Sequence, residues 1–198
     1  MKKIDANYLV RLSLLCAVLV VMSVTPLGYL NVTGLFSITF LTIPVIVAAI
    51  TLGPGASAFL GLVFGVTSFI NAFSNIMGQT FLSISPLYTL ILCVVPRVLE
   101  GLLAGLIFKG LKKLFKKSTL PATLASISCP VLNTVLYMSS LVLLFGRSEY
   151  ILSLRGGKNI FSFVVAFVGI NAVVEAVVCG VLGALISLAL IKVLKISK

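Results

Sequence analysis

Three ionisable side chains, Arg97, Glu100 and Glu175, fall inside long apolar stretches of the chain. A charged side chain at the centre of a bilayer costs about 2.5–3.5 kcal/mol unless it is paired or faces water, so each marks a candidate functional site. An arginine guanidinium binds a carboxylate through two parallel hydrogen bonds. The chemistry on offer is therefore recognition of a small polar or anionic molecule.

Two asparagines add neutral polar groups at similar depth. Asn133 lies near the middle of one apolar stretch, and Asn171 precedes Glu175 by four residues, which puts both on one face of a helix. At 1.5 Å per residue, Arg97 and Glu175 lie roughly 15–22 Å from the outer ends of their helices. Three helices then share one polar layer, as a small-molecule pocket between helices requires.

The same residues also fit a purely structural role. Arg97 can pair with Glu100 at i,i+3, or with Glu175 from another helix, and asparagines can join helices by hydrogen bonds. Whether Glu100 is a structural partner or a functional group stays open at this point.

The elements that must position these residues are membrane helices. Of 198 residues, 60% are hydrophobic and 10% charged, which is too little charge to cover a soluble core. We predict an all-α integral membrane protein, a single domain over residues 1–198 with six transmembrane helices. The predicted spans are 9–30, 38–52, 56–70, 87–108, 120–145 and 161–194. The second and third are short for a span of roughly 20 residues, and Gly53-Pro54-Gly55 predicts that they form a helical hairpin.

Basic residues predict the orientation. Most fall on one side of a six-span topology: Lys2, Lys3, Arg11, Lys109, Lys112, Lys113, Lys116, Lys117, Lys192, Lys195 and Lys198. The opposite loops carry Arg147, Arg155 and Lys158, so the positive-inside rule places both termini in the cytoplasm. The net charge of +11 thus indicates membrane topology, with no nucleic-acid partner.

The polar segment 71–86 is predicted to be an outer loop, either a lid or a passive connector.

The composition excludes most enzymes. Histidine is absent, which removes Ser-His and Cys-His pairs and histidine metal sites. The one aspartate, Asp5, lies in the polar N-terminal tail, and no GxxxxGK[ST] motif is present to bind ATP. The four cysteines have no CxxC spacing and are interpreted as packing residues. We predict no catalytic residue, no metal and no cofactor, so any pumping must be powered by another subunit.

Short motifs between residues 25 and 100 resemble a known family. They are TPLGY at 25–29, TIPV at 42–45, LGPGA at 52–56, GLVFGVTS at 61–68 and VPR at 95–97. In these motifs, and in length and span count, the chain resembles the substrate-binding S components of energy-coupling factor (ECF) vitamin transporters. Within that family it is most similar to the S components assigned to pantothenate.

The resemblance implies a high-affinity capture subunit in a bacterial cell membrane, crossing it several times. Such a subunit docks on a transmembrane coupling subunit that carries two cytoplasmic ATPases, and topples in the membrane to release the vitamin inside. Family members commonly carry an Ala-xxx-Ala step in the first helix that contacts the coupling subunit. The matching positions here are Ser13 and Ala17, so serine replaces the first alanine.

Pantothenate carries one carboxylate, two hydroxyls and an amide. Arg97 is expected to bind the carboxylate, while Asn133, Asn171 and Glu175 serve the hydroxyls and the amide. The phenols of Tyr88 and Tyr137 are further candidate donors.

Three alternatives remain. Another vitamin, such as riboflavin, folate or a pyridoxine-like compound, fits the same family, although the absence of Trp argues modestly against large flat rings. A proton-coupled secondary transporter would use Glu175 or Glu100 as proton carrier, but the two halves of the chain show no convincing repeat. A non-transporting scaffold would bind no small molecule.

Overall fold

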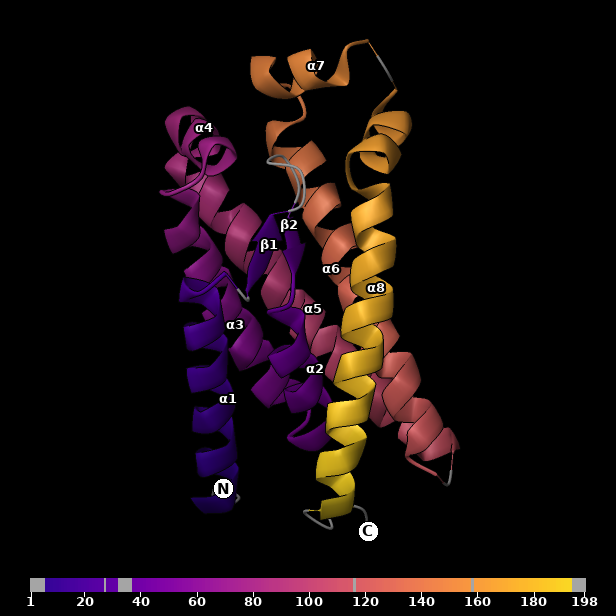
Figure 1. Ribbon diagram of the computed structural model, residues 1–198. Helices are drawn as coiled ribbons and strands as arrows, with labels where there is room; N and C mark the ends of the chain where they lie inside the picture. The colour runs from indigo at the N-terminus through magenta and orange to yellow at the C-terminus, as the bar shows by residue number, and fades with distance from the viewer. Residues whose placement is uncertain (1–5, 27, 32–36, 116, 158, 194–198) are drawn as a thin grey trace.

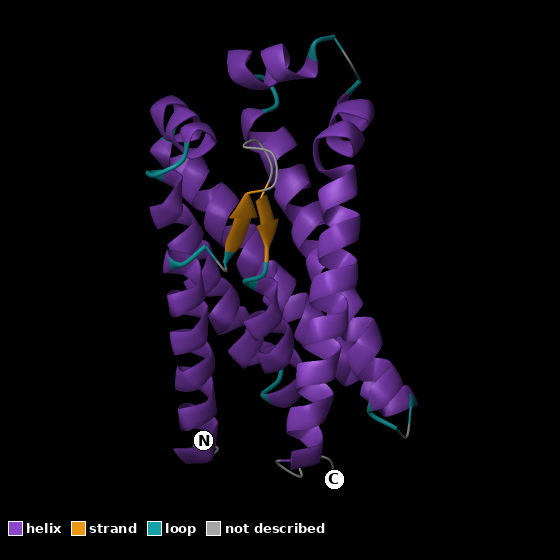
Figure 2. Ribbon diagram, viewed as in Figure 1, coloured by secondary structure: helices purple, strands orange, loops and turns teal. Residues whose placement is uncertain are grey.

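The computed structural model describes residues 6–26, 28–31, 37–115, 117–157 and 159–193 as a bundle of helices around a short β-hairpin (Figures 1 and 2). The helices are α1 (Ala6–Val24), α2 (Thr42–Thr51), α3 (Pro54–Ala72), α4 (Ile76–Ile84), α5 (Pro86–Leu114), α6 (Thr119–Phe145), α7 (Glu149–Arg155) and α8 (Ile160–Val193). The strands are β1 (Tyr29–Asn31) and β2 (Ser37–Thr39), which pair antiparallel. The helical membrane class is confirmed, and the hairpin is a feature that the sequence did not predict.

Five described helices are long and apolar enough to cross a membrane: α1, α3, α5, α6 and the 172–193 part of α8. The ten residues of α2 cover about 15 Å at 1.5 Å per residue, roughly half of the hydrocarbon thickness. The six predicted spans thus correspond to five long helices and the short apolar helix α2, which follows strand β2 of the β-hairpin. Helix α1 begins and helix α8 ends at the same end of the bundle, at the bottom of Figure 1.

The predicted helical hairpin is present at Gly53. Helix α2 ends at Thr51 and α3 begins at Pro54. Gly53 has a φ of 97°, a left-handed conformation that glycine adopts without a Cβ penalty. Pro54 then opens α3 at a position where no backbone N–H is needed.

Three boundaries differ from the sequence prediction. The predicted second span, 38–52, begins too early, because residues 38 and 39 belong to β2 and α2 begins at Thr42. Helix α1 ends at Val24, before Pro26, so the predicted span 9–30 is too long: its last residues belong to a turn and to β1. The segment predicted as a loop over 71–86 contains helix α4. The side chain of Asn75 caps this helix, with its Oδ1 accepting a hydrogen bond from the Gly78 N–H at 2.7 Å.

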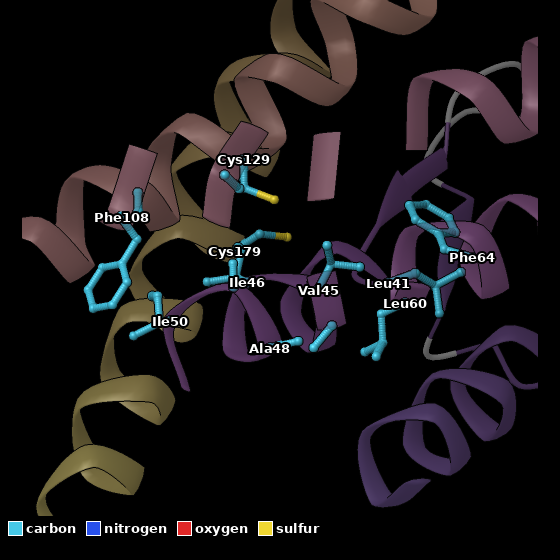
Figure 3. Close-up of a cluster of buried hydrophobic side chains, with 14 of the residues drawn as sticks. Leu41, Val45, Ile46, Ala48, Ile50, Leu60, Phe64, Phe108, Cys129 and Cys179 are labelled. Carbon is cyan, nitrogen blue, oxygen red and sulfur yellow. The ribbon is translucent and has the colours of Figure 1, made fainter. Parts of the chain in front are cut away.

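The inner part of the core is built around α2, which other helices surround. Figure 3 shows side chains of α2 packed among residues from four other helices, with Leu60 and Phe64 of α3, Phe108 of α5, Cys129 of α6 and Cys179 of α8. Val45 and Ala48 of α2 are fully buried. A helix so enclosed does not need to cross the bilayer alone, because protein replaces lipid around it.

Helices α3 and α5 pack at backbone distance. A Cβ atom added at Gly61 would overlap the Arg97 carbonyl oxygen, and one added at Gly101 would overlap the Ser57 carbonyl oxygen. The Ser57 hydroxyl also donates to the Gly101 carbonyl oxygen at 2.6 Å. These small residues therefore serve internal packing, and they hold α5 closely against α3.

Candidate functional site

The β-hairpin lies among membrane helices rather than outside them. Figure 2 shows its two strands midway along the bundle, and Thr39 of β2 is bonded to helix α8. Non-helical backbone at membrane depth is tolerated where it is buried in protein or lines a water-filled cavity. The hairpin therefore marks the part of the bundle where a ligand site is expected.

Side chains from two sides hold the hairpin. On α8, the buried carboxylate of Glu175 accepts a hydrogen bond from the Thr39 N–H at 2.6 Å, and the Cys179 thiol lies 3.5 Å from the Thr39 carbonyl oxygen. On α3, the Ser68 hydroxyl lies 3.0 Å from the Tyr29 hydroxyl of β1. The hairpin thus bridges α8 and α3 across the centre of the bundle.

Arg97 of α5 is held between two aromatic rings. Its guanidinium carbon lies 4.4 Å from the centre of the Tyr137 ring on α6 and 5.4 Å from that of Phe64 on α3. A guanidinium within about 6 Å of a ring face gains cation–π attraction, most strongly where water is excluded. This arrangement fixes the plane of the guanidinium between α3 and α6.

Pro96 supplies a third restraint on Arg97. Proline has no backbone N–H, so it leaves the carbonyl oxygen of Leu92, four residues earlier, without its usual helical donor. The Nη1 atom of Arg97 donates a hydrogen bond to this oxygen at 3.0 Å. The carbonyl oxygen that Pro96 leaves without a backbone donor therefore anchors the Arg97 guanidinium.

Two buried polar atoms beside this anchor have no hydrogen-bond partner among the described residues: Arg97 Nε and Asn133 Oδ1. Neither Glu100 nor Glu175 forms a salt bridge with Arg97, so the structural pairs considered from the sequence are not formed. Arg97 as a whole is half-buried, but its Nε–H is buried without an acceptor among the described residues, and an unsatisfied buried donor is costly. The arrangement is suited to a ligand whose carboxylate or other oxygen accepts the hydrogen bond from this N–H.

Glu100 occupies a separate environment. It is fully buried between α5 and α6, and the thiol of Cys129 donates to its Oε1 at 3.1 Å. Its Oε2 has no partner in the described part of the chain. Glu100 lies about one helical turn after Arg97 on α5, and its carboxylate interacts with α6.

The polar groups lie between two apolar clusters. The inner cluster surrounds α2, and the outer one includes Phe81 of α4, Phe145 of α6 and Ile151 of α7. The Phe81 ring is 4.7 Å from that of Phe145 and 5.8 Å from that of Tyr150. These aromatic contacts lie at the end of the bundle opposite the two termini (Figure 1).

The structure brings some of the predicted site residues together and separates others. Arg97 and Tyr137 are in contact, and Asn133 lies one turn from Tyr137 on the same face of α6. The Glu175 carboxylate is hydrogen-bonded to Thr39 of the β-hairpin and not to Arg97. Tyr88 is exposed and packs on Phe145, about 13.5 Å along α5 from Arg97.

Further candidates lie elsewhere. The side chain of Asn171 lies outside the described residues. Ser13 and Ala17 are both exposed on α1. Sequence reasoning missed Phe64 and Ser68 as site residues, although both belong to the GLVFGVTS motif at 61–68.

Comparison with known proteins gives two matches. The model of the family "ECF transporter, substrate-specific component" matches residues 7–187. The chain is 31% identical to the pantothenic acid transporter PanT of Lactococcus lactis subsp. cremoris (strain MG1363), over 97% of each of the two proteins.

Proposed function

The chain belongs to the family of substrate-specific components of ECF transporters, and we propose that it captures pantothenate at a site formed by Arg97, Asn133 and Tyr137. Family membership makes it a membrane subunit for vitamin uptake and not an enzyme. The similarity to a pantothenic acid transporter favours this vitamin over riboflavin, folate or pyridoxine.

The observation that carries the proposal is the Nε–H of Arg97, which is buried without a hydrogen-bond acceptor among the described residues and has no carboxylate bonded to it there. Nη1 already donates to Leu92, so the edge that carries Nε is left for the ligand. The pantothenate carboxylate accepts two charge-assisted hydrogen bonds from this edge. A hydroxyl or the amide N–H of the vitamin then donates to Asn133 Oδ1, which has no partner among the residues that the structure describes.

The other predicted residues take more distant roles in this proposal. Glu175 acts as a positioning residue, because its carboxylate holds Thr39 and with it strand β2 of the β-hairpin. Asn171 stays a candidate from the sequence alone, because it precedes Glu175 by four residues and its side chain lies outside the described residues. Tyr88 contributes to the aromatic closure at Phe145 instead of binding the vitamin.

We further propose that both termini are cytoplasmic and that a coupling subunit with two ATPases drives release by toppling of the capture subunit. The end of the bundle where α1 begins and α8 ends also carries the lysines of the last turns of α5 and α8, in agreement with the positive-inside rule. The exposed Ser13 and Ala17 offer a close-approach surface for the coupling subunit.

Equilibrium binding to the purified chain in detergent tests the substrate. Labelled pantothenate is titrated beside riboflavin, folate and pyridoxine, and tight saturable binding is expected for pantothenate alone. Arg97→Ala is expected to weaken it by about 100-fold or more, since truncating one partner of a buried charge pair costs about 2–5 kcal/mol. Arg147→Ala, which removes an exposed cation beyond α6, is the matched control and keeps wild-type affinity. Equal affinity in the two variants would refute the site.

Uptake into cells tests the coupling. The double variant Ser13→Leu/Ala17→Leu is expected to bind pantothenate normally but to lose most uptake, because bulky side chains prevent close helix contact. Val131→Leu/Val135→Leu on the exposed face of α6 is the control and should transport normally. Uptake that persists in cells without the ATPases would instead support a proton-coupled secondary transporter.

A further inference from the structure

A second site lies at the opposite end of α5 from the outer aromatic cluster. Here α2, α3 and α5 enclose a cleft of about 310 Å³, at the small end of the range for ligand pockets. Its wall includes Ile50, Pro54 and Phe108, and its rim carries Lys109, Lys112 and Lys113. An apolar floor with a rim of cations is suited to binding an amphiphilic anion.

The floor of the cleft is part of the protein core. Ile50 and Phe108 belong to the inner apolar cluster, and Figure 3 shows their side chains next to each other between α2 and α5. The turn at Gly53 and Pro54 forms another side. Such a surface excludes a strongly hydrated ion and accepts a hydrocarbon chain.

No carboxylate of the described residues lies at the rim. The three lysines follow α5 at i, i+3 and i+4, so they share one helix face, and all three are exposed. The carboxylates of the described residues lie elsewhere: Glu100 is buried against Cys129, Glu175 is bonded to Thr39, and Glu149 opens α7 at the other end of the molecule. The positive charge of the rim therefore calls for an external anion.

The position of the cleft identifies the source of that anion. The lysines lie at the end of the apolar part of a membrane-spanning helix, where the chain leaves the hydrocarbon region for the headgroup layer. Basic pockets between membrane helices on the cytoplasmic side bind anionic lipid headgroups. We propose that this cleft binds one anionic phospholipid, with its phosphate on Lys109, Lys112 and Lys113 and an acyl chain against Ile50 and Phe108.

Native mass spectrometry of the full chain in a neutral detergent tests the proposal. Phosphatidylglycerol and phosphatidylcholine with identical acyl chains are titrated in parallel. One phosphatidylglycerol molecule is expected to bind saturably at concentrations where phosphatidylcholine does not. Lys109→Gln/Lys112→Gln/Lys113→Gln is expected to weaken binding by about 100-fold, since each lysine near a headgroup contributes roughly fivefold.

A matched triple variant, Arg11→Gln/Arg147→Gln/Lys192→Gln, removes the same charge away from the cleft and should bind phosphatidylglycerol as the wild type does. Equal loss in both triple variants would mean a general charge effect and would overturn the proposal. So would equal binding of the two lipids, or full competition by glycerol 3-phosphate, which would indicate a phosphate site without an acyl chain. Unchanged lipid binding in the cleft variant, combined with loss of the coupling subunit on purification, would mean that the rim docks a protein instead.

Discussion

The two faces of helix α5 show opposite ways of packing in a membrane protein. Toward α3, the backbones meet at Gly61 and Gly101, where even one added carbon atom would collide with a carbonyl group. Toward α6, the Arg97 guanidinium contacts Tyr137 while also lying near Phe64 of α3, and Glu100 contacts Cys129. This side includes buried polar atoms without hydrogen-bond partners among the described residues. The face toward α3 is tightly packed, whereas the face toward α6 keeps polar atoms that can still form hydrogen bonds with a ligand.

The difference indicates that the two faces of α5 have different roles: one fixes the position of the helix, and the other presents polar side chains. The close contact with α3 fixes the height and rotation of α5, since glycine contacts tolerate no sliding. Because α5 is fixed on that side, the side chains on its other face keep their positions although some lack partners. A preorganised polar face of this kind costs less to bind a ligand than one that must first order itself.

The largest effect is expected from breaking the close-packed face. Gly61→Ala places a methyl group against the carbonyl oxygen of Arg97, and overpacking of this kind costs about 1–3 kcal/mol. The variant should unfold at lower temperature and bind pantothenate more weakly, because Arg97 is displaced with its backbone. Gly110→Ala has open space around the new carbon atom and should match or exceed wild-type stability. If Gly61→Ala keeps both stability and affinity, the two faces of α5 are not coupled.

A smaller and more selective effect is expected from Pro96→Ala. Alanine restores a backbone donor to the Leu92 carbonyl oxygen and so competes with the Arg97 side chain for it. We expect discrimination between pantothenate and its alcohol analogue, in which CH₂OH replaces the carboxylate, to fall about tenfold, as loss of a charged hydrogen bond implies.

The control measurements for Pro96→Ala separate positioning from folding. Affinity for the alcohol analogue should stay constant, and the unfolding temperature should not fall, because an interior proline is itself unfavourable in a helix. A parallel loss of affinity for both compounds would mean that the proline shapes the whole helix and not the guanidinium alone.

The smallest effect is expected at the hairpin. Glu175→Gln keeps an oxygen that accepts from the Thr39 N–H, so pantothenate affinity should change by less than about threefold. Glu175→Ala leaves that N–H buried without a partner, at a cost of about 1–3 kcal/mol, and should weaken binding more. A large loss in Glu175→Gln would show that the charge itself matters, as direct contact with the vitamin or proton transfer would require.

Much of this architecture was predictable because it follows from hydropathy. Apolar runs indicated the long helices, and the Gly53-Pro54-Gly55 turn indicated the α2–α3 hairpin. The β-hairpin was not predictable in the same way. Its strands are three residues long and are held by Glu175 and Ser68, which lie far away in sequence.

The site was predictable in its residue types but not in its pairings. Arg97 and Asn133 stood out because polar residues are rare inside apolar runs. Helix rotation decides which groups meet, and hydropathy does not report rotation. The assignment of Glu175 to Thr39 and of Glu100 to Cys129, instead of to Arg97, depends on that rotation.

The bond between Arg97 and the Leu92 carbonyl oxygen has a consequence for protein engineering. The proline and the arginine are neighbours in the chain, and the acceptor lies four residues before the proline, so all the parts belong to one stretch of six residues. A designer who wants a cation at another depth of a membrane helix can move this Pro-Arg pair as a unit, whereas an arginine moved without its proline would arrive with no free carbonyl oxygen to hold it.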